Sequence, residues 1–232
     1  MKAIRAIFFD WMDTIGHPEV ERHELHARIF SKFGVEVSPE KLIRPIYLAE
    51  TELPGGTPYR WDESKDPEPF LHYEELILSG IGVALPGETV FRIMKIVSHD
   101  AKRVDFSLYD DVLPTMKTLK SSGLILGLIT SMKEEINLIS RQLGLEAYLD
   151  FTVTSSDVGV PKPEPPVFLS ALKHADINAA EAIYVGDQYS TDVVGARGVG
   201  INPVLIDRYN VFPEIDDCPR IRTLVEIPNI IW

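Results

Sequence analysis

The sequence predicts an α/β protein whose parallel sheet is interrupted, after the first strand, by an all-helical block. Residues 4–9 form a short, nearly continuous apolar run, which is typical of a strand buried on both faces of a parallel sheet. Residues 17–103 show helical periodicity instead. From residue 104 onward, apolar runs alternate with segments of helical spacing, which indicates repeated strand–helix–strand units.

The helical block follows directly after the first strand. That strand ends at Asp10, and residues 13–18 have the pattern of a loop. Apolar residues recur at helical spacing from Leu25 onward. Ser38 followed by Pro39 is a typical helix start, because serine caps a helix and proline fits its first position. We expect helices over residues 20–33, 39–52, 69–79 and 87–102.

The second half of the chain predicts the rest of the sheet. We expect strands over residues 124–129, 150–154, 182–185 and 203–206, and helices over residues 112–122, 134–143, 166–174 and 192–198. Residues 221–232 predict a short strand plus a turn. An insertion after the carboxyl end of a strand lies over the crevice where such sheets bind ligands. The sequence therefore predicts a core of residues 1–16 and 104–232, and a helical cap of residues 17–103.

Composition excludes several classes of function. The 232 residues carry a formal net charge of −12, and no cluster of lysine and arginine is longer than two residues, which argues against a nucleic-acid partner. No apolar stretch is long enough to span a membrane. The single cysteine, Cys218, suits a reducing cytoplasm. We expect a cytoplasmic protein that binds a small anionic substrate. Its oligomeric state stays open, with a homodimer as one arrangement.

Polar residues stand at or after four strand ends of the predicted sheet. They are Asp10, Thr130, the segment that leads from Thr154 to Lys162, and Asp187. Carboxyl ends of parallel strands lie on one side of a sheet, so these groups can converge. Two carboxylates, a hydroxyl and an ammonium suit a phosphate-like group together with Mg²⁺, which prefers oxygen ligands. An aspartate can also attack phosphorus covalently, while a lysine and a metal ion offset the charge on the transferred group.

Four segments of the chain resemble the motifs of the haloacid dehalogenase-like hydrolase superfamily. They are residues 8–15, 128–130, 162–165 and 186–196, and the last two read KPEP and GDQYSTDVVGA. The combination is specific, although any one motif alone is weak. The chain is similar in particular to the branch with a helical cap inserted after the first motif, and the match covers nearly the whole chain. The resemblance implies a Rossmann-like core.

The resemblance also implies roles for individual residues. Asp10 corresponds to the nucleophile that forms an aspartyl intermediate. Thr130 corresponds to the residue that hydrogen-bonds the transferring group, and Lys162 to the one that neutralises the nucleophile and the phosphate. We expect Trp11 and Ser131 to join Thr130 and Lys162 in binding the substrate.

A Mg²⁺ site follows from the same resemblance. The ion would be bound by the carboxylates of Asp10, Asp187 and Asp192, and by the backbone carbonyl of Met12.

The first motif departs from the family pattern at one position. Phosphatases of the superfamily carry a second aspartate two residues after the nucleophile, as general acid and base, and this chain has Met12 there. A thioether neither donates nor accepts the proton. Asp13 is one residue further on, and on an extended chain its side chain faces away from the nucleophile. Whether Asp13 or His17 replaces the missing acid stays open.

Three functions remain. The first is a Mg²⁺-dependent hydrolase of a small phosphorylated or phosphonate metabolite, which the metal-binding aspartates favour. The second is a low-activity or non-catalytic protein that binds a phosphorylated ligand or a partner, which Met12 favours. The third is a metal-independent 2-haloacid dehalogenase, because a halide leaves without protonation. The sequence does not identify the substrate, since the cap that selects it follows no transferable code.

Overall fold

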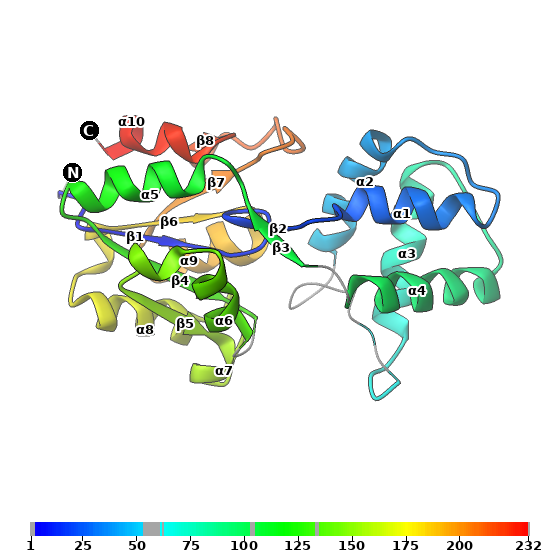
Figure 1. Ribbon diagram of the computed structural model, residues 1–232, viewed down its shortest axis with the longest axis horizontal. Coiled ribbons are helices and arrows are strands. Elements are labelled where there is room, and N and C mark those ends of the chain that lie inside the picture. The colour runs from blue at the N-terminus through cyan, green and yellow to red at the C-terminus, as the bar shows by residue number, and fades with distance from the viewer. Residues whose placement is uncertain (1–2, 53–60, 62, 103–104, 133–134, 232) are drawn as a thin grey trace. The chain divides into compact units, whose positions relative to one another are not determined.

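Six parallel strands form one sheet within the part of the chain that the computed structural model describes, namely residues 3–52, 61, 63–102, 105–132 and 135–231. The sheet order is β5-β4-β1-β6-β7-β8 (Figure 1). The strands are β1 (Ala6–Phe9), β4 (Ile125–Thr130), β5 (Phe151–Thr154), β6 (Ala182–Gly186), β7 (Asn202–Ile206) and β8 (Arg220–Ile221). The predicted α/β fold with a parallel sheet is confirmed.

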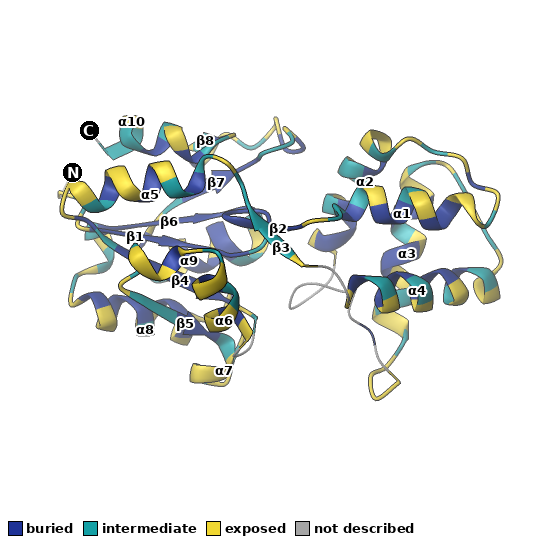
Figure 2. Ribbon diagram, viewed as in Figure 1, coloured by how far each residue is buried: buried dark blue, intermediate teal, exposed yellow. Residues whose placement is uncertain are grey.

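Strand β1 lies at the centre of this sheet, between β4 and β6. Ala6 is opposite both Ile125 of β4 and Ala182 of β6. Every residue of β1 is buried, as its apolar run predicts. Ala6 and Phe8 share a core cluster with helix α8 (Pro165–Ala175). The intervening β1 residues point to the opposite face and are equally buried, so both faces of the sheet are covered (Figure 2).

Helices lie between the strands of the sheet, and α10 (Ile227–Ile231) follows the last strand. Those between the strands are α5 (Val112–Ser121), α6 (Glu135–Gln142), α7 (Ser155–Val158), α8 and α9 (Val194–Gly198). The segment predicted as one helix over residues 192–198 differs, because a π-helical turn, Tyr189–Val193, precedes α9. In this turn the backbone N–H of Asp192 donates to the carbonyl of Gln188, at 2.8 Å.

Two predictions about the ends of the core were wrong. Residues 13–18 were expected to form a loop, yet β2 (Gly16–Pro18) pairs with β3 (Phe106–Leu108). The chain can do so because a tight turn over residues 11–16 precedes β2. Residues 221–232 were expected to form a short strand plus a turn. Ile221 does end strand β8, but a 3₁₀-helix and α10 follow it in place of the turn. There, Thr223 and Glu226 form a capping box that starts the helical segment ending in α10.

The chain divides into two compact units, Met1–His17 with Ser107–Trp232, and Pro18–Phe106. The boundary expected between residues 103 and 104 falls outside the described residues. Among the described residues of the second unit, four helices share a separate apolar core that includes Phe30, Leu42 and Ile93. They are α1 (Arg22–Ser31), α2 (Pro39–Thr51), α3 (Glu68–Gly80) and α4 (Gly87–Ala101).

Charged side chains are buried inside this helical unit. Arg22 of α1 forms an ion pair with Glu50 of α2, and both side chains are almost fully buried. The Arg22 guanidinium also lies over the ring of Tyr47, 5.1 Å from its centroid. Nearby along α1, His26 Nε2 is 3.5 Å from Glu74 Oε1. A buried ion pair contributes little net stability while intact, but removing one partner leaves a buried charge uncompensated.

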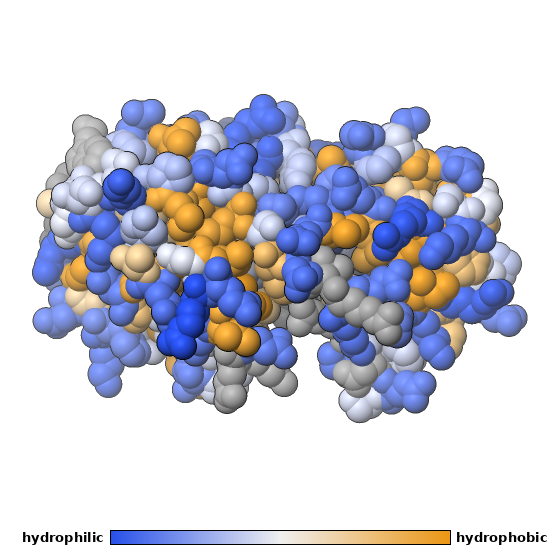
Figure 3. Space-filling view, in the orientation of Figure 1, coloured by the Kyte–Doolittle hydropathy of each residue, from blue (hydrophilic) through white to orange (hydrophobic). Residues whose placement is uncertain are grey.

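No helix within the described ranges combines the length and apolar character needed to cross a bilayer. On the face shown in Figure 3, apolar residues gather in patches that polar residues surround. The large exposed apolar side chains belong to different elements, for example Leu138 of α6 and Leu169 of α8.

The buried ion pair gives a stability prediction for the helical unit. We expect Glu50→Ala to lower the free energy of unfolding by about 3 kcal/mol, because Arg22 would stay buried without its carboxylate. Urea denaturation followed by circular dichroism measures this change.

Asp100→Ala is the matched control in the same unit. It removes the partner of Arg28 from a partly exposed pair that is 3.7 Å apart, so the expected change is within about 0.5 kcal/mol. If the two substitutions lowered the free energy of unfolding equally, burial of the Arg22–Glu50 pair would not explain the loss of stability.

Candidate active site

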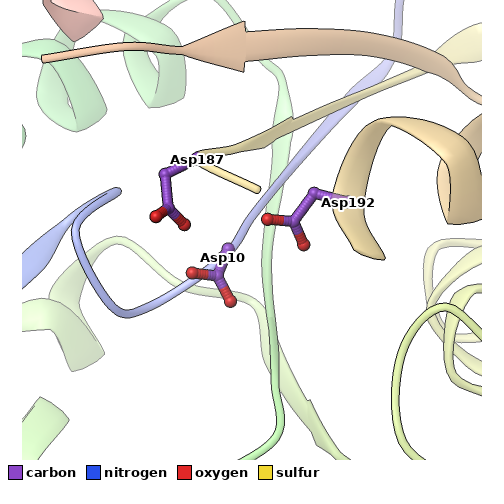
Figure 4. A group of neighbouring side chains, drawn as sticks. All are labelled: Asp10, Asp187 and Asp192. Atoms are coloured by element: carbon purple, nitrogen blue, oxygen red, sulfur yellow. The ribbon is translucent and has the colours of Figure 1, made fainter. Parts of the chain in front are cut away.

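Three carboxylates meet at the carboxyl edge of the sheet. Asp10 follows β1, Asp187 follows β6, and Asp192 lies in the π-helical turn. Figure 4 shows the three side chains pointing toward one another. One carboxylate oxygen from each residue lies within 4.8 Å of those from the other two, and all three residues are buried. The backbone N–H of Asp10 donates to the carbonyl of Val185 at 2.8 Å, which fixes the end of β1 against β6.

The Asp192 carboxylate packs against the end of β6 because residue 186 is a glycine. A Cβ at Gly186 would lie 2.4 Å from the Asp192 carboxylate, so no larger residue fits there without a shift. The backbone N–H of Gln188 donates to Asp192 Oδ2 at 3.0 Å. Gly186 and the π-helical turn therefore bring Asp192 back toward the end of β6, beside Asp187.

Lys162 neutralises part of this negative charge. Its ammonium donates to Asp10 Oδ1 at 2.5 Å, to Asp192 Oδ1 at 2.7 Å and to the Tyr184 hydroxyl at 3.0 Å. An ammonium has three N–H donors, and these three acceptors match them. The Lys162 side chain is only 7% exposed, so the contacts form in a region of low dielectric.

Burial and charge have opposite effects on the ionisation of this group. Burial raises the pKa of Asp10 to about 6, although the adjacent Lys162 opposes the rise. Burial alone would lower the pKa of Lys162, but Asp10 and Asp192 together raise it above its usual range, so Lys162 stays an ammonium. Burial also raises the pKa of Tyr184 well above its usual range, which keeps the phenol protonated.

The remaining predicted site residues have other described contacts. Thr130 ends β4, and its Oγ1 accepts a hydrogen bond from the backbone N–H of Met132 at 3.1 Å. Ser131 is exposed and accepts a 3.3 Å hydrogen bond from the Ser155 hydroxyl. The indole of Trp11 is fully buried, and a Cβ at Gly16 would meet it at 2.5 Å. Trp11 thus packs within the turn after Asp10, and its contact with a substrate stays a prediction.

Met12 and Asp13 lie in the tight turn that follows Asp10. Met12 forms a bridge with Gly16, and the backbone N–H of Asp13 donates to the Gly16 carbonyl at 2.7 Å. Asp13 has a φ of 55°, a left-handed conformation that is uncommon for a non-glycine residue. It is buried, yet among the described residues the group of mutually close acidic ligands contains Asp10, Asp187 and Asp192, not Asp13.

Arg208, which follows β7, was not among the predicted site residues. Its guanidinium donates to the Thr14 carbonyl at 3.2 and 2.6 Å and to both carboxylate oxygens of Asp111 at 3.1 Å. It also lies 3.7 Å above the ring of Tyr109, on which His17 packs with a centroid distance of 4.5 Å. Arg208 therefore fixes the turn that carries Met12 and Asp13. Arg208 lies just after a predicted strand, and this position could have indicated a residue at the same edge of the sheet.

Tyr184 was also missed, because β6 was interpreted as an apolar strand. The phenol lies at the centre of that strand and is fully buried. A buried tyrosine hydroxyl usually has a hydrogen-bond partner, so a tyrosine inside a predicted buried strand could have indicated a polar residue nearby.

The chain is similar to known proteins over most of its length. Residues 73–206 match the family described as haloacid dehalogenase-like hydrolase. The chain is 30% identical over 214 residues to a glyceraldehyde 3-phosphate phosphatase of Methanopyrus kandleri, covering 88% of this chain and 84% of that protein. It is 34% identical over 217 residues to the human haloacid dehalogenase-like hydrolase domain-containing protein 3, covering 88% and 82%. The crystal structure of a HAD phosphatase from Thermococcus onnurineus is similar, with a TM-score of 0.57 and 27% identity over 98% of each chain.

The three carboxylates fit a hard divalent cation, because Mg²⁺ is bound in proteins by carboxylate and carbonyl oxygens. We expect Mg²⁺ at about 100 times its dissociation constant to stabilise the protein by about 3 kcal/mol, which is about 5–10 °C in the unfolding midpoint. Differential scanning calorimetry measures the shift, and Asp187→Asn should abolish most of it.

Asp216→Asn is the control for this prediction, because Asp216 is exposed and the substitution removes the same charge. Since the pKa of Asp10 is about 6, protons compete with the ion at lower pH, and the stabilisation by Mg²⁺ should shrink as the pH falls from about 7 to about 5. An equal Mg²⁺ shift in wild type and Asp187→Asn would exclude this metal site.

Proposed function

Because this chain belongs to the haloacid dehalogenase-like hydrolases, we propose that it is a Mg²⁺-dependent hydrolase of a small phosphorylated or phosphonate metabolite, with Asp10 as the nucleophile. The observation that carries this proposal is the hydrogen-bonded contact of Lys162 with both Asp10 and Asp192, beside Asp187. The Methanopyrus kandleri relative named as a phosphatase supports a phosphate ester as the substrate class.

In the proposed reaction a carboxylate oxygen of Asp10 attacks phosphorus. The new bond joins this oxygen to phosphorus while the bond from phosphorus to the leaving oxygen breaks, which gives an aspartyl phosphate. Water then attacks the aspartyl phosphate and restores the Asp10 carboxylate with release of phosphate. Lys162 reduces the negative charge that Asp10 and the transferred group would otherwise accumulate.

Mg²⁺ would be held by Asp10, Asp187 and Asp192 with the backbone carbonyl of Met12, and would supply positive charge against the phosphoryl oxygens. Although burial raises the pKa of Asp10 to about 6, this value is still below neutral pH, so the carboxylate is largely ionised there and is available to attack. Thr130 and Ser131 would contact the transferring group and the substrate from the end of β4.

The helical unit Pro18–Phe106 is proposed as the cap that selects the substrate. Its apolar core is its own, so its surface can vary without disturbing the sheet. In this proposal the phosphoryl chemistry belongs to Met1–His17 with Ser107–Trp232, and the helical unit selects the leaving group.

Met12 is the observation that favours a second function. A methionine at the acid/base position leaves the departing oxygen without a proton donor from that residue, so ester hydrolysis should be slow when the leaving group is a poor one. If no other group supplies the proton, the protein would bind a phosphorylated ligand and hydrolyse it very slowly. Hydrolysis rates for a series of esters with different leaving groups distinguish this function from that of an efficient hydrolase.

The first test removes the nucleophile. We expect Asp10→Asn to lower the Mg²⁺-dependent hydrolysis of p-nitrophenyl phosphate by at least about 10³-fold, because an amide is a far weaker nucleophile than a carboxylate. Release of p-nitrophenol measures the rate, with the exposed Asp216→Asn variant as the control that keeps activity. Wild-type protein without Mg²⁺-dependent turnover would refute the hydrolase proposal for phosphate esters.

The second test restores the missing acid. In a series of phosphate monoesters, kcat/KM of the wild type should fall steeply as the pKa of the leaving alcohol rises. Met12→Asp should raise kcat/KM for alkyl phosphates by about 10²–10⁴-fold and change activated aryl phosphates much less, because only poor leaving groups need a proton.

Met12→Asn is the matched control, since it is similar in size to aspartate but does not exchange a proton near neutral pH. If the wild type already hydrolyses alkyl phosphates as fast as aryl phosphates, another group supplies the proton. Asp13→Asn and His17→Gln then identify which of those two residues does so.

A further inference from the structure

Tyr184 places a phenol inside an otherwise apolar strand. It lies in β6, between β1 and β7, opposite Phe8 on one side and Pro203 on the other. The ring packs edge-on against Phe168 of α8, with a centroid distance of 5.2 Å. Packing alone is a role that phenylalanine would also fill, so the hydroxyl is the feature that needs a separate explanation.

The Tyr184 hydroxyl forms hydrogen bonds with both Lys162 and Asp192. It accepts a hydrogen bond from Lys162 Nζ at 3.0 Å and donates one to Asp192 Oδ1 at 2.9 Å. Lys162 donates to the same Asp192 oxygen at 2.7 Å, so the three groups form a closed triangle. The remaining N–H of Lys162 points to Asp10, at 2.5 Å.

We propose that Tyr184 is a positioning residue whose hydroxyl holds the Lys162 ammonium against Asp10. This inference rests on the function proposed above, in which Lys162 offsets the charge on Asp10 and the transferred group. The lysine side chain is long and flexible, and three acceptors in different directions restrict its ammonium more than two carboxylates do. Asp10 and Asp192 supply negative charge, and the neutral Tyr184 hydroxyl accepts the third hydrogen bond of the ammonium.

The hydroxyl suits this place better than another carboxylate. A further negative charge would add to the repulsion among Asp10, Asp187 and Asp192, whose ligand oxygens already lie within 4.8 Å of one another. A phenol accepts from Lys162 and donates to Asp192 without adding charge. Its ring projects from β6, whose backbone pairs with β1 and β7, so the strand pairing sets the position of the oxygen.

Tyr184→Phe tests the proposal, because it deletes the hydroxyl and keeps the ring. With p-nitrophenyl phosphate and saturating Mg²⁺, we expect kcat to fall by about 10-fold with a much smaller change in KM, since Lys162 acts mainly in the transition state. The apparent Mg²⁺ dissociation constant should change by less than about 3-fold, because Asp192 keeps its hydrogen bonds to Lys162 and Gln188.

A spectroscopic measurement reports on Lys162 directly and needs no turnover. In ¹H–¹⁵N spectra of the lysine ammonium groups, the buried and hydrogen-bonded Lys162 should give a signal protected from exchange with water, assigned by its loss in Lys162→Met. We expect this signal to broaden or disappear in Tyr184→Phe. Tyr73→Phe removes a buried phenol hydroxyl from the helical unit and should keep the signal and the activity.

Phe168→Leu separates the hydroxyl from the packing of the ring. It loosens the contact with Tyr184 but keeps the hydroxyl, so the Lys162 signal should persist. If Phe168→Leu loses the signal as completely as Tyr184→Phe does, packing rather than the hydroxyl holds Lys162, and the proposal is wrong. An unchanged Lys162 signal and unchanged kcat in Tyr184→Phe would also overturn it.

The two proposals fail in different ways. If the wild type hydrolyses no phosphate ester, the proposed function fails, while the ammonium spectra still decide whether Tyr184 holds Lys162. If the loss of kcat in Tyr184→Phe is matched by an equal loss of Mg²⁺ affinity, the hydroxyl acts on the metal ligands, and its assignment to Lys162 is refuted.

Discussion

The ammonium of Lys162 between Asp10 and Asp192 is the interaction on which the rest of the site depends. Asp10, Asp187 and Asp192 are buried close together, and three uncompensated carboxylates at such distances would repel one another strongly. Lys162 offsets two of them at once. Its own burial is tolerable only because Asp10, Asp192 and Tyr184 satisfy its donors, so each member of the cluster requires the others.

Strand pairing and one close backbone approach bring this cluster together. Parallel strands end on one edge, so Asp10 and Asp187 are neighbours because β1 pairs with β6. Asp192 reaches them because Gly186 has no Cβ and because the π-helical turn widens the start of the next helix. The turn after Asp10 is fixed separately by Arg208, which binds the Thr14 carbonyl from beyond β7.

The helical unit manages its buried charge in a different way. Its Arg22–Glu50 pair is enclosed in its own core and is separate from the carboxylate cluster in the chain's other unit. The pair therefore affects the stability of the helical unit. In the proposed function, Lys162 instead offsets charge during the reaction, and Met12 leaves the site without the proton donor that aspartate would supply at that position.

The sequence by itself determined the parallel α/β fold, the helical block after the first strand, and the polar residues at the strand ends. Continuous apolar runs and local helical periodicity are properties of neighbouring residues, so they can be interpreted without coordinates. The π-helical turn, the pairing of β2 with β3 and the helical end of the chain depend on hydrogen bonds that periodicity does not encode.

Tertiary structure alone decided how the predicted residues are joined. Lys162 and Asp10 are 152 positions apart, and Arg208 and Thr14 are 194 apart, so no local pattern links either pair. Tyr184 looked like one more apolar position of a buried strand, because its hydroxyl gains a function only when the sheet places it beside Lys162. Local sequence specified which groups are present, and the packing of distant segments specified which of them share charge and hydrogen bonds.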